Sequence, residues 1–195
     1  MKPEADNFYH IYNRGINKCK LFYSDRNYWF FINKMREYIC PHCSLIAYTL
    51  MPNHFHLIIH ANENTEKMVI KGSGPVNVLS EGLRIMLSSY SQAINQQLGR
   101  VGNLFQQNTK NKILINDPGN SFAVVNMDYL EYCFHYVHNN ASKAGIVMSP
   151  LNWPYSSFHE YFGKPTLRIC DVELTRKYID LLSYEKLHLP FILNV

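Results

Sequence analysis

Two histidines, two positions apart, are the clearest candidates for chemistry in this chain. His54 and His56 follow a Pro-Asn pair and lie in a short apolar run. In a β-strand such residues point to the same face, about 7 Å apart along the backbone, so their imidazoles can share one divalent metal ion. The alternate positions predict a core on the opposite face: Phe55, Leu57 and Ile59. The plain alternative is a solvated strand face, because short motifs of this kind often arise by chance.

A helix predicted from about Ser121 to Asn140 carries the second group of candidates. Its apolar stripe should face the core: Met127, Leu130, Phe134 and Val137. A second stripe, rotated by roughly 125°, is polar: Tyr129, Tyr132, Tyr136 and Asn140. Tyr136 and Asn140 are four residues apart and hence neighbours, so a phenol nucleophile and an amide oxygen could serve one metal site. Against this, tyrosines on a helix are usually half-buried packing residues.

The elements that must position these residues follow from periodicity and turn signals. A strand at 8–12, a helix from an Asp25 N-cap to about 39, a hairpin of strands at 44–50 and 54–60, a helix ending at Gly99 and a strand at 112–115 are expected. This order predicts an α+β ferredoxin-like sandwich. We expect an antiparallel sheet of four to five strands, with helices on one face and the tyrosine helix near the His-x-His strand.

Domain boundaries are less sharply marked than the elements. Residues 62–78 contain the run KGSGP and are predicted to be a flexible loop. Residues 1–164 are predicted to form one domain, and residues 165–195 an extension that packs on this domain or on a partner.

Composition excludes several classes of protein. The chain has 195 residues, of which 47% are hydrophobic and 17% charged, and this is not the composition of a disordered protein. The net charge of +4 leans only mildly towards an anionic partner. The apolar runs are too short to span a bilayer, so no membrane association is expected. Five cysteines form an odd set, which favours a reducing, cytoplasmic setting.

Cys40 and Cys43 have the spacing of a zinc knuckle. A second pair of ligands at the distance of a zinc finger does not follow in the sequence, so structural cysteines are the favoured interpretation.

Five segments in order resemble one protein family. They are FYHIYNRG at 8–15, AYTLMPNHFHL at 47–57, GRVGNLFQ at 99–106, YVHNNASKAG at 136–145 and WPYSS at 153–157. Together they are similar to the REP-associated tyrosine transposase branch of the single-tyrosine HUH (IS200-like) transposases. The chain has Ala141 where this family normally has proline, which loosens the turn after the tyrosine helix and leaves the chemistry intact.

The resemblance implies a DNA transposase or endonuclease that nicks and rejoins single-stranded DNA at hairpin-forming repeats. It assigns the nucleophile to Tyr136, which would form a 5′-phosphotyrosine intermediate. It also assigns the metal to His54 and His56, with Asn140 as the third ligand. Mg²⁺ or Mn²⁺ is expected as the cofactor, because either would neutralise the phosphate during attack.

Contacts to single-stranded or hairpin DNA are expected from residues that flank these segments. The basic candidates are Arg14, Arg100, Lys110, Lys112 and Lys143, and the candidates for stacking on unpaired bases are Phe105 and Tyr155. The alternative for each residue is a solvated charge or a core aromatic ring. The sequence also allows a homodimer.

Two rival functions remain open at this point. One is a domesticated relative that binds repeat DNA without cutting it, and the other is a nuclease that has lost the ability to rejoin strands. A covalent protein–DNA adduct would distinguish the transposase from both.

Overall fold

The computed structural model describes residues 3–72, 74–114 and 123–181, with only the backbone for residues 123–128. Its elements, in order, are β1 (Phe8–Arg14), a 3-10 turn η1 (Ile16–Lys18), α1 (Asp25–Tyr38), β2 (Cys43–Met51), β3 (His54–Ala61), α2 (Glu63–Glu66), β4 (Met68–Lys71), β5 (Gly74–Asn77), α3 (Val78–Leu98), β6 (Lys110–Ile113), α4 (Ala123–His138), α5 (Asn140–Lys143), η2 (Pro150–Asn152), α6 (Phe158–Phe162) and α7 (Val172–Tyr178). The last residue of the strand predicted at 112–115 and the start of the tyrosine helix at Ser121 lie outside the described residues.

The central sheet has four antiparallel strands in the order β2-β3-β1-β6. This is the strand order of a ferredoxin-like sandwich, because β6 is the strand that follows the second long helix. The predicted α+β fold is therefore confirmed. The β2–β3 hairpin turns at Pro52 and Asn53, as expected, and pairs Met51 with His54.

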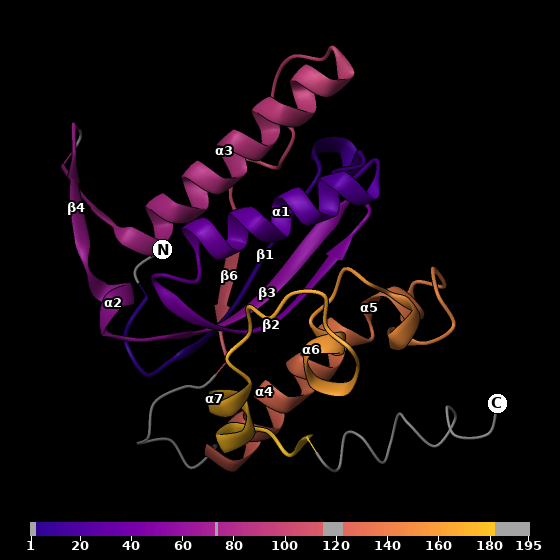
Figure 1. Cartoon of the computed structure of the whole chain (residues 1–195). Coiled ribbons are helices and arrows are strands. Elements are labelled where there is room, and N and C mark those ends of the chain that lie inside the picture. Colours follow the sequence, from indigo (N-terminus) through magenta and orange to yellow (C-terminus); the bar gives the residue numbers. More distant parts are fainter. Residues whose placement is uncertain (1–2, 73, 115–122, 182–195) are drawn as a thin grey trace.

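Each face of the sheet carries its own core. One core joins the sheet to α1 and α3 through residues such as Phe31, Leu57 and Tyr90. The other joins the opposite face to α4 and the segment after it through Ile58, Phe134 and other apolar residues. Figure 1 shows α1 and α3 on one side of the sheet and α4 and α7 on the other. The tyrosine helix thus lies on the face from which the two histidines project.

Local capping explains where the two long helices of the first face begin and end. The N-cap of α1 is Ser24, not Asp25, because Ser24 forms a capping box with Asn27. The side chain of Asn77 caps the start of α3. The predicted stop at Gly99 is confirmed, with this glycine in the left-handed conformation that favours it.

Residues 62–78 are more ordered than the sequence indicates, so the loop prediction is wrong for much of this segment. Asn62 caps the short helix α2, and β4 and β5 form a two-stranded hairpin that pairs Val69 with Val76. Lys71 forms an ion pair with Glu81 at 3.1 Å, which joins the hairpin to α3. The hairpin is closed where Lys71 pairs with Gly74.

The extension after residue 164 is described as far as residue 181, and this part lies against β2. The backbone N–H of Asp171 donates to the carbonyl of Leu45, and the Asp171 carboxylate accepts from Ser44. Ile179 is buried in the core beside α4. Whether residue 164 marks a domain boundary stays a prediction.

The two cysteines with knuckle spacing belong to the core region. Cys43 is buried and its thiol donates to the carbonyl of Ile39, while Cys40 donates to Ile169. Burial raises the pKa of both thiols, so both remain protonated. These contacts favour the structural interpretation of the pair.

Gly82 lies where α3 passes close to the end of α1. A Cβ at this position would lie 2.2 Å from the backbone carbonyl oxygen of Tyr38. Alanine normally stabilises a helix interior by about 1 kcal/mol relative to glycine, but this overlap would force the helices apart. We expect Gly82→Ala to lower the free energy of unfolding by about 1–3 kcal/mol, measured by urea denaturation. Gly72→Ala is the control, because a Cβ there meets nothing within 4 Å, and an equal loss in both variants would contradict the argument.

Candidate active site

The two histidines are held by the register of β3 against β1. His56 pairs with Tyr12 and His54 with Arg14. Their imidazole centroids lie 5.1 Å apart, with the rings nearly perpendicular. Phe55 is fully buried on the opposite face. The predicted alternation is thus observed: the imidazoles share one face while the phenylalanine anchors the strand in the core.

The tyrosine predicted as the nucleophile faces this pair. The apolar side of α4 is buried against the sheet through Leu130, Phe134 and Val137. This packing leaves Tyr136 half-buried, with its ring centroid 5.4 Å from that of His56. Tyr136 and both histidines line a cavity of about 270 Å³. The side chain of Met127, the remaining member of the predicted stripe, lies outside the described residues.

Asn140 lies at the same site, but on a different helix from the one predicted. The helix α4 ends at His138, and Asn140 begins the short helix α5. It is therefore not on one continuous helix with Tyr136, yet it is buried and its side chain lies close enough to His54 to raise the pKa of that imidazole. The structure thus brings His54, His56, Tyr136 and Asn140 together.

Each imidazole has one nitrogen engaged by a neighbour. Nδ1 of His54 lies 2.7 Å from Oδ1 of Asn53, and Nδ1 of His56 lies 2.8 Å from Nε2 of His10. An amide oxygen only accepts, so in this contact the His54 proton is on Nδ1, which leaves Nε2 unprotonated and able to bind a metal. His56 has the same arrangement in the tautomer that donates to His10. Metal-binding histidines are commonly held in this way by a second partner.

Burial keeps these imidazoles neutral. Desolvation, followed by the charges of His10 and His54, lowers the pKa of His56 to about 3. Desolvation and the nearby Lys112 lower the pKa of His10 to about 4. The pKa of His54 is also lowered, mainly by burial, although its contact with Asn140 opposes this shift. Neutral imidazole is the form that binds a metal, so the donors are ready at neutral pH.

The donor set fits a divalent ion that accepts mixed ligands. Among residues 3–72, 74–114 and 123–181, no group of three His, Cys, Asp or Glu side chains could hold a metal. An ion at this site would therefore need oxygen donors in addition to the two imidazoles. Asn140 offers such an oxygen, and Mg²⁺ or Mn²⁺ accepts amide and water oxygens.

Only two of the five predicted basic contacts line the cavity. Arg14 and Lys110 line the cavity beside the histidines. Lys112 lies two positions after Lys110 on β6 and therefore on the same face, and it donates to the hydroxyl of Tyr129 at 2.8 Å. Lys143 is exposed on α5. Arg100 lies elsewhere, beyond the end of α3, where it donates to the carbonyl of Asn103.

The two aromatic residues proposed to stack on bases are both packed in the core. Tyr155 is stacked on Tyr28 with ring centroids 3.7 Å apart, and Trp153 covers its edge. Phe105 is 7% exposed and lies between Phe55 and Tyr90. The alternative of a core role therefore describes Tyr155. The ring of Phe105 also borders a second cavity, described below.

The segment WPYSS fixes the end of the tyrosine helix. Nε2 of His138 lies 2.7 Å from Oγ of Ser157, which also accepts from the backbone of Tyr48. The indole N–H of Trp153 donates to the carbonyl of Leu50. These contacts join α4 to β2, two residues beyond Tyr136.

Sequence reasoning missed several residues of the site, among them His10, Tyr12 and Gln106. His10 supports His56, Tyr12 pairs with it across the strands, and Gln106 lines the cavity. His10 and Tyr12 alternate with core residues of β1, and the alternation of that strand was the signal that could have placed them on the histidine face. No comparable signal marks Gln106.

Of three comparisons with known proteins, only the structural one found a similar protein. No known sequence family matches the chain, and no curated protein sequence matches it. The structure is similar to a solved structure described as a REP-associated tyrosine transposase bound to a REP hairpin. The similarity covers 87% of this chain and 86% of the other, with a TM-score of 0.57 and 17% sequence identity. It shows a shared fold. None of the described helices is both long enough and apolar enough to cross a membrane.

Proposed function

We propose that this protein cuts and rejoins single-stranded DNA through a covalent bond to Tyr136. The observation that carries the proposal is the placement of this phenol beside His54 and His56 in a cavity that also contains Arg14 and Lys110. A nucleophile, two neutral metal donors and two cations are groups suited to transfer of a phosphodiester. A solvated strand face would not need the support that Asn53 and His10 give to the imidazoles.

In this proposal His54, His56 and Asn140 hold Mg²⁺ or Mn²⁺. The bound ion supplies neutralisation of the scissile phosphate and stabilises the charge that develops on it. Arg14 and Lys110 hold the flanking phosphates of the same strand.

The Tyr136 oxygen attacks the phosphorus, and the bond from phosphorus to the 3′ oxygen breaks. The phenol proton is lost to solvent, and the departing oxygen takes up a proton to become a 3′-hydroxyl. The protein is left linked to the 5′-phosphate of the other fragment. The covalent bond conserves the energy of the phosphodiester, so a new 3′-hydroxyl can attack it and restore the phenol.

The substrate we propose is DNA with a hairpin and unpaired flanks. The similar structure is described as bound to a REP hairpin, and the shared fold supports a related ligand for this chain. A homodimer is compatible with this function and stays a prediction.

A denaturing gel tests the proposal directly. The probe is a pool of single-stranded hairpins with randomised flanks, labelled at the 3′ end in one sample and at the 5′ end in the other, incubated with Mn²⁺. We expect a protein-linked band with the 3′ label and a free shortened fragment with the 5′ label. Free fragments with both labels would indicate a hydrolytic nuclease, and intact bound DNA a non-catalytic binding protein. Either of these results would overturn the proposal.

His10 gives a prediction that separates positioning from bulk stability. We expect His10→Leu to weaken Mn²⁺ binding by about 10- to 100-fold, because Nδ1 of His56 loses its partner and the ring can rotate. His10→Gln, which keeps a hydrogen-bonding group, should recover much of this affinity. Binding is measured by titration of Mn²⁺ with electron paramagnetic resonance. Equal affinities in the leucine variant and the unaltered protein would show that His10 does not position the ligand.

A further inference from the structure

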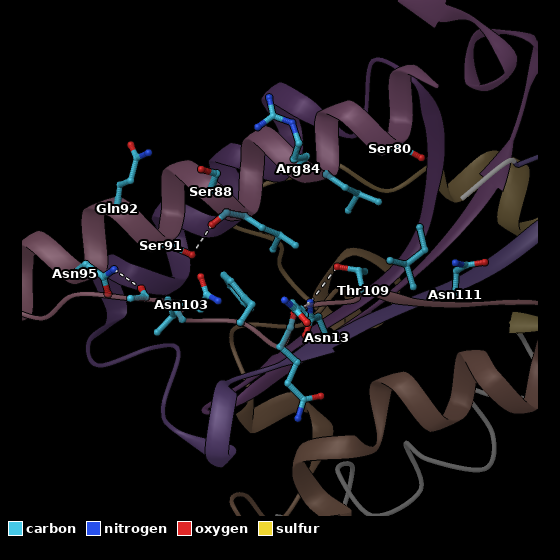
Figure 2. Close-up of a pocket in the computed structure, with 18 residues that line it drawn as sticks. Asn13, Ser80, Arg84, Ser88, Ser91, Gln92, Asn95, Asn103, Thr109 and Asn111 are labelled. Atoms are coloured by element: carbon cyan, nitrogen blue, oxygen red, sulfur yellow. Dashed lines mark hydrogen bonds between the residues drawn. The ribbon is translucent and has the colours of Figure 1, made fainter. Parts of the chain in front are cut away.

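A second and larger cavity lies on the other face of the sheet. It has a volume of about 550 Å³ and is bounded by α3 and by the chain between Gly102 and Asn111. Leu83, Leu87 and Phe105 provide an apolar floor. Figure 2 shows hydroxyl and amide groups around this floor, such as Ser91 on the helix and Asn103 opposite it. The volume lies in the range of small-ligand sites.

The charges of the lining decide what class of ligand this cavity suits. Among the described residues that line it, the single charged side chain is Arg84. That guanidinium is already engaged by both carboxylate oxygens of Glu81, at 2.7 and 2.8 Å. The cavity therefore offers no free cation for a phosphate. By contrast, the cavity at His54 and His56 has Arg14 and Lys110 in its wall.

An uncharged ligand with a flat apolar face and hydrogen-bonding edges matches this lining. Unpaired nucleobases have both properties, because they stack on aromatic and apolar surfaces and their edges pair with Asn and Gln amides. Gln92, Gln106 and Gln107 add further amide groups to the wall.

The two cavities meet at one place. Asn13 and Gln106 line both of them. The amide nitrogen of Asn13 donates to the carbonyl of Gln106 at 3.1 Å and to Oγ1 of Thr109 at 3.0 Å, which holds the segment that separates the cavities. A strand with its phosphate beside Tyr136 could therefore place a neighbouring base against α3 by passing this segment.

We propose that the cavity under α3 binds an unpaired base of the strand whose phosphate lies at Tyr136. The inference rests on the proposed function, since it takes the same DNA strand as ligand. In this arrangement the cavity at Tyr136 holds the charged DNA backbone, and the cavity under α3 accepts the neutral base.

The test compares DNA with and without bases. The probes are the dodecanucleotides dA12, dC12 and dT12 and an abasic dodecamer with the same number of phosphates. Binding is measured by fluorescence anisotropy at one fixed salt concentration in EDTA, so that no cutting occurs. We expect the protein to bind at least one base-containing probe about ten-fold more tightly than the abasic probe.

A matched pair of serines on α3 locates the effect. Ser91 and Ser89 are both partly exposed and both donate to a helix carbonyl, but only Ser91 is part of the cavity wall. We expect the new side chain in Ser91→Phe to fill the cavity, so that base-containing and abasic probes bind with about equal affinity. The affinity for the abasic probe itself should stay unchanged. Ser89→Phe should keep the preference. If Ser91→Phe is poorly folded by circular dichroism, the exposed Asn103→Leu serves in its place and should lower the preference several-fold.

The outcomes separate this inference from the proposed function. Binding of all four probes with equal affinity, or a preference that survives in Ser91→Phe and Asn103→Leu, would overturn the base site alone. Failure to bind any of the probes would also overturn the base site, and the adduct gel with hairpin DNA would then decide the proposed function separately.

Discussion

Tyr136→Phe is expected to abolish the covalent protein–DNA adduct completely. The substitution removes one oxygen atom, and the ring can keep its contact with His56, where the two ring centroids are 5.4 Å apart. The packing of α4 depends on Leu130, Phe134 and Val137, so the fold should be unaffected. Binding of DNA and of Mn²⁺ should stay within about two-fold of the unaltered protein, because the side chains proposed to hold them are all retained. The measurement is the 3′-labelled denaturing gel, with anisotropy for DNA binding.

Tyr132→Phe is the matched control for this variant. Tyr132 lies one turn earlier on α4, is 60% exposed and contacts Tyr129 rather than the histidines. We expect its adduct to form at the normal rate. A persistent adduct in the Tyr136 variant, or its loss in the Tyr132 variant, would place the nucleophile elsewhere.

His56→Ala should produce the largest change in metal binding. It removes one of the two neutral imidazole donors and leaves His10 without its partner at 2.8 Å. Loss of a supporting partner alone typically costs 10- to 100-fold in metal affinity, so we expect loss of a ligand to cost at least about 100-fold. Adduct formation should fall in parallel. Mn²⁺ titration by electron paramagnetic resonance measures the affinity without relying on catalysis.

His60→Gln controls for the loss of a buried histidine from the same strand. His60 is on the same face of β3 but packs against Phe8 and Tyr178, away from Tyr136. Its replacement should leave Mn²⁺ affinity unchanged. Similar losses in the His56 and His60 variants would point to a general effect on β3, and unaltered affinity in both would exclude His56 as a ligand.

Much of the fold could be predicted because periodicity directly reflects burial. The alternation at 54–60 and the helical spacing before Gly99 arise from faces that pack on the sheet, and both elements are observed. The turn at Pro52 and Asn53 was equally clear, since these residue types favour a turn. By contrast, the β4–β5 hairpin is short and has few core residues, so its composition resembles that of a loop.

The site was predictable where its residues are adjacent in sequence or on one helix. His54, His56 and Tyr136 lie together because a hairpin and a helix are on one face of the sheet, whereas Asn140 belongs to the separate short helix α5. His10 could not be identified as a partner of His56, because the two are 46 residues apart and their contact depends on strand register. The role of Tyr155 could not be predicted either. An aromatic residue beside a motif looks the same in the sequence whether its ring stacks on a ligand or, as here, on Tyr28.

Asn13 gives the two cavities a common wall, and this has a thermodynamic consequence. If each cavity holds part of one strand, a ligand in one cavity that shifts Asn13 or Gln106 also alters the wall of the other cavity and therefore its affinity. Linkage requires the coupling to be reciprocal, with the same factor in both directions. Recognition of a base on one side of the sheet would then favour capture of a phosphate on the other, and strands without a suitable base would be held less often where cutting occurs.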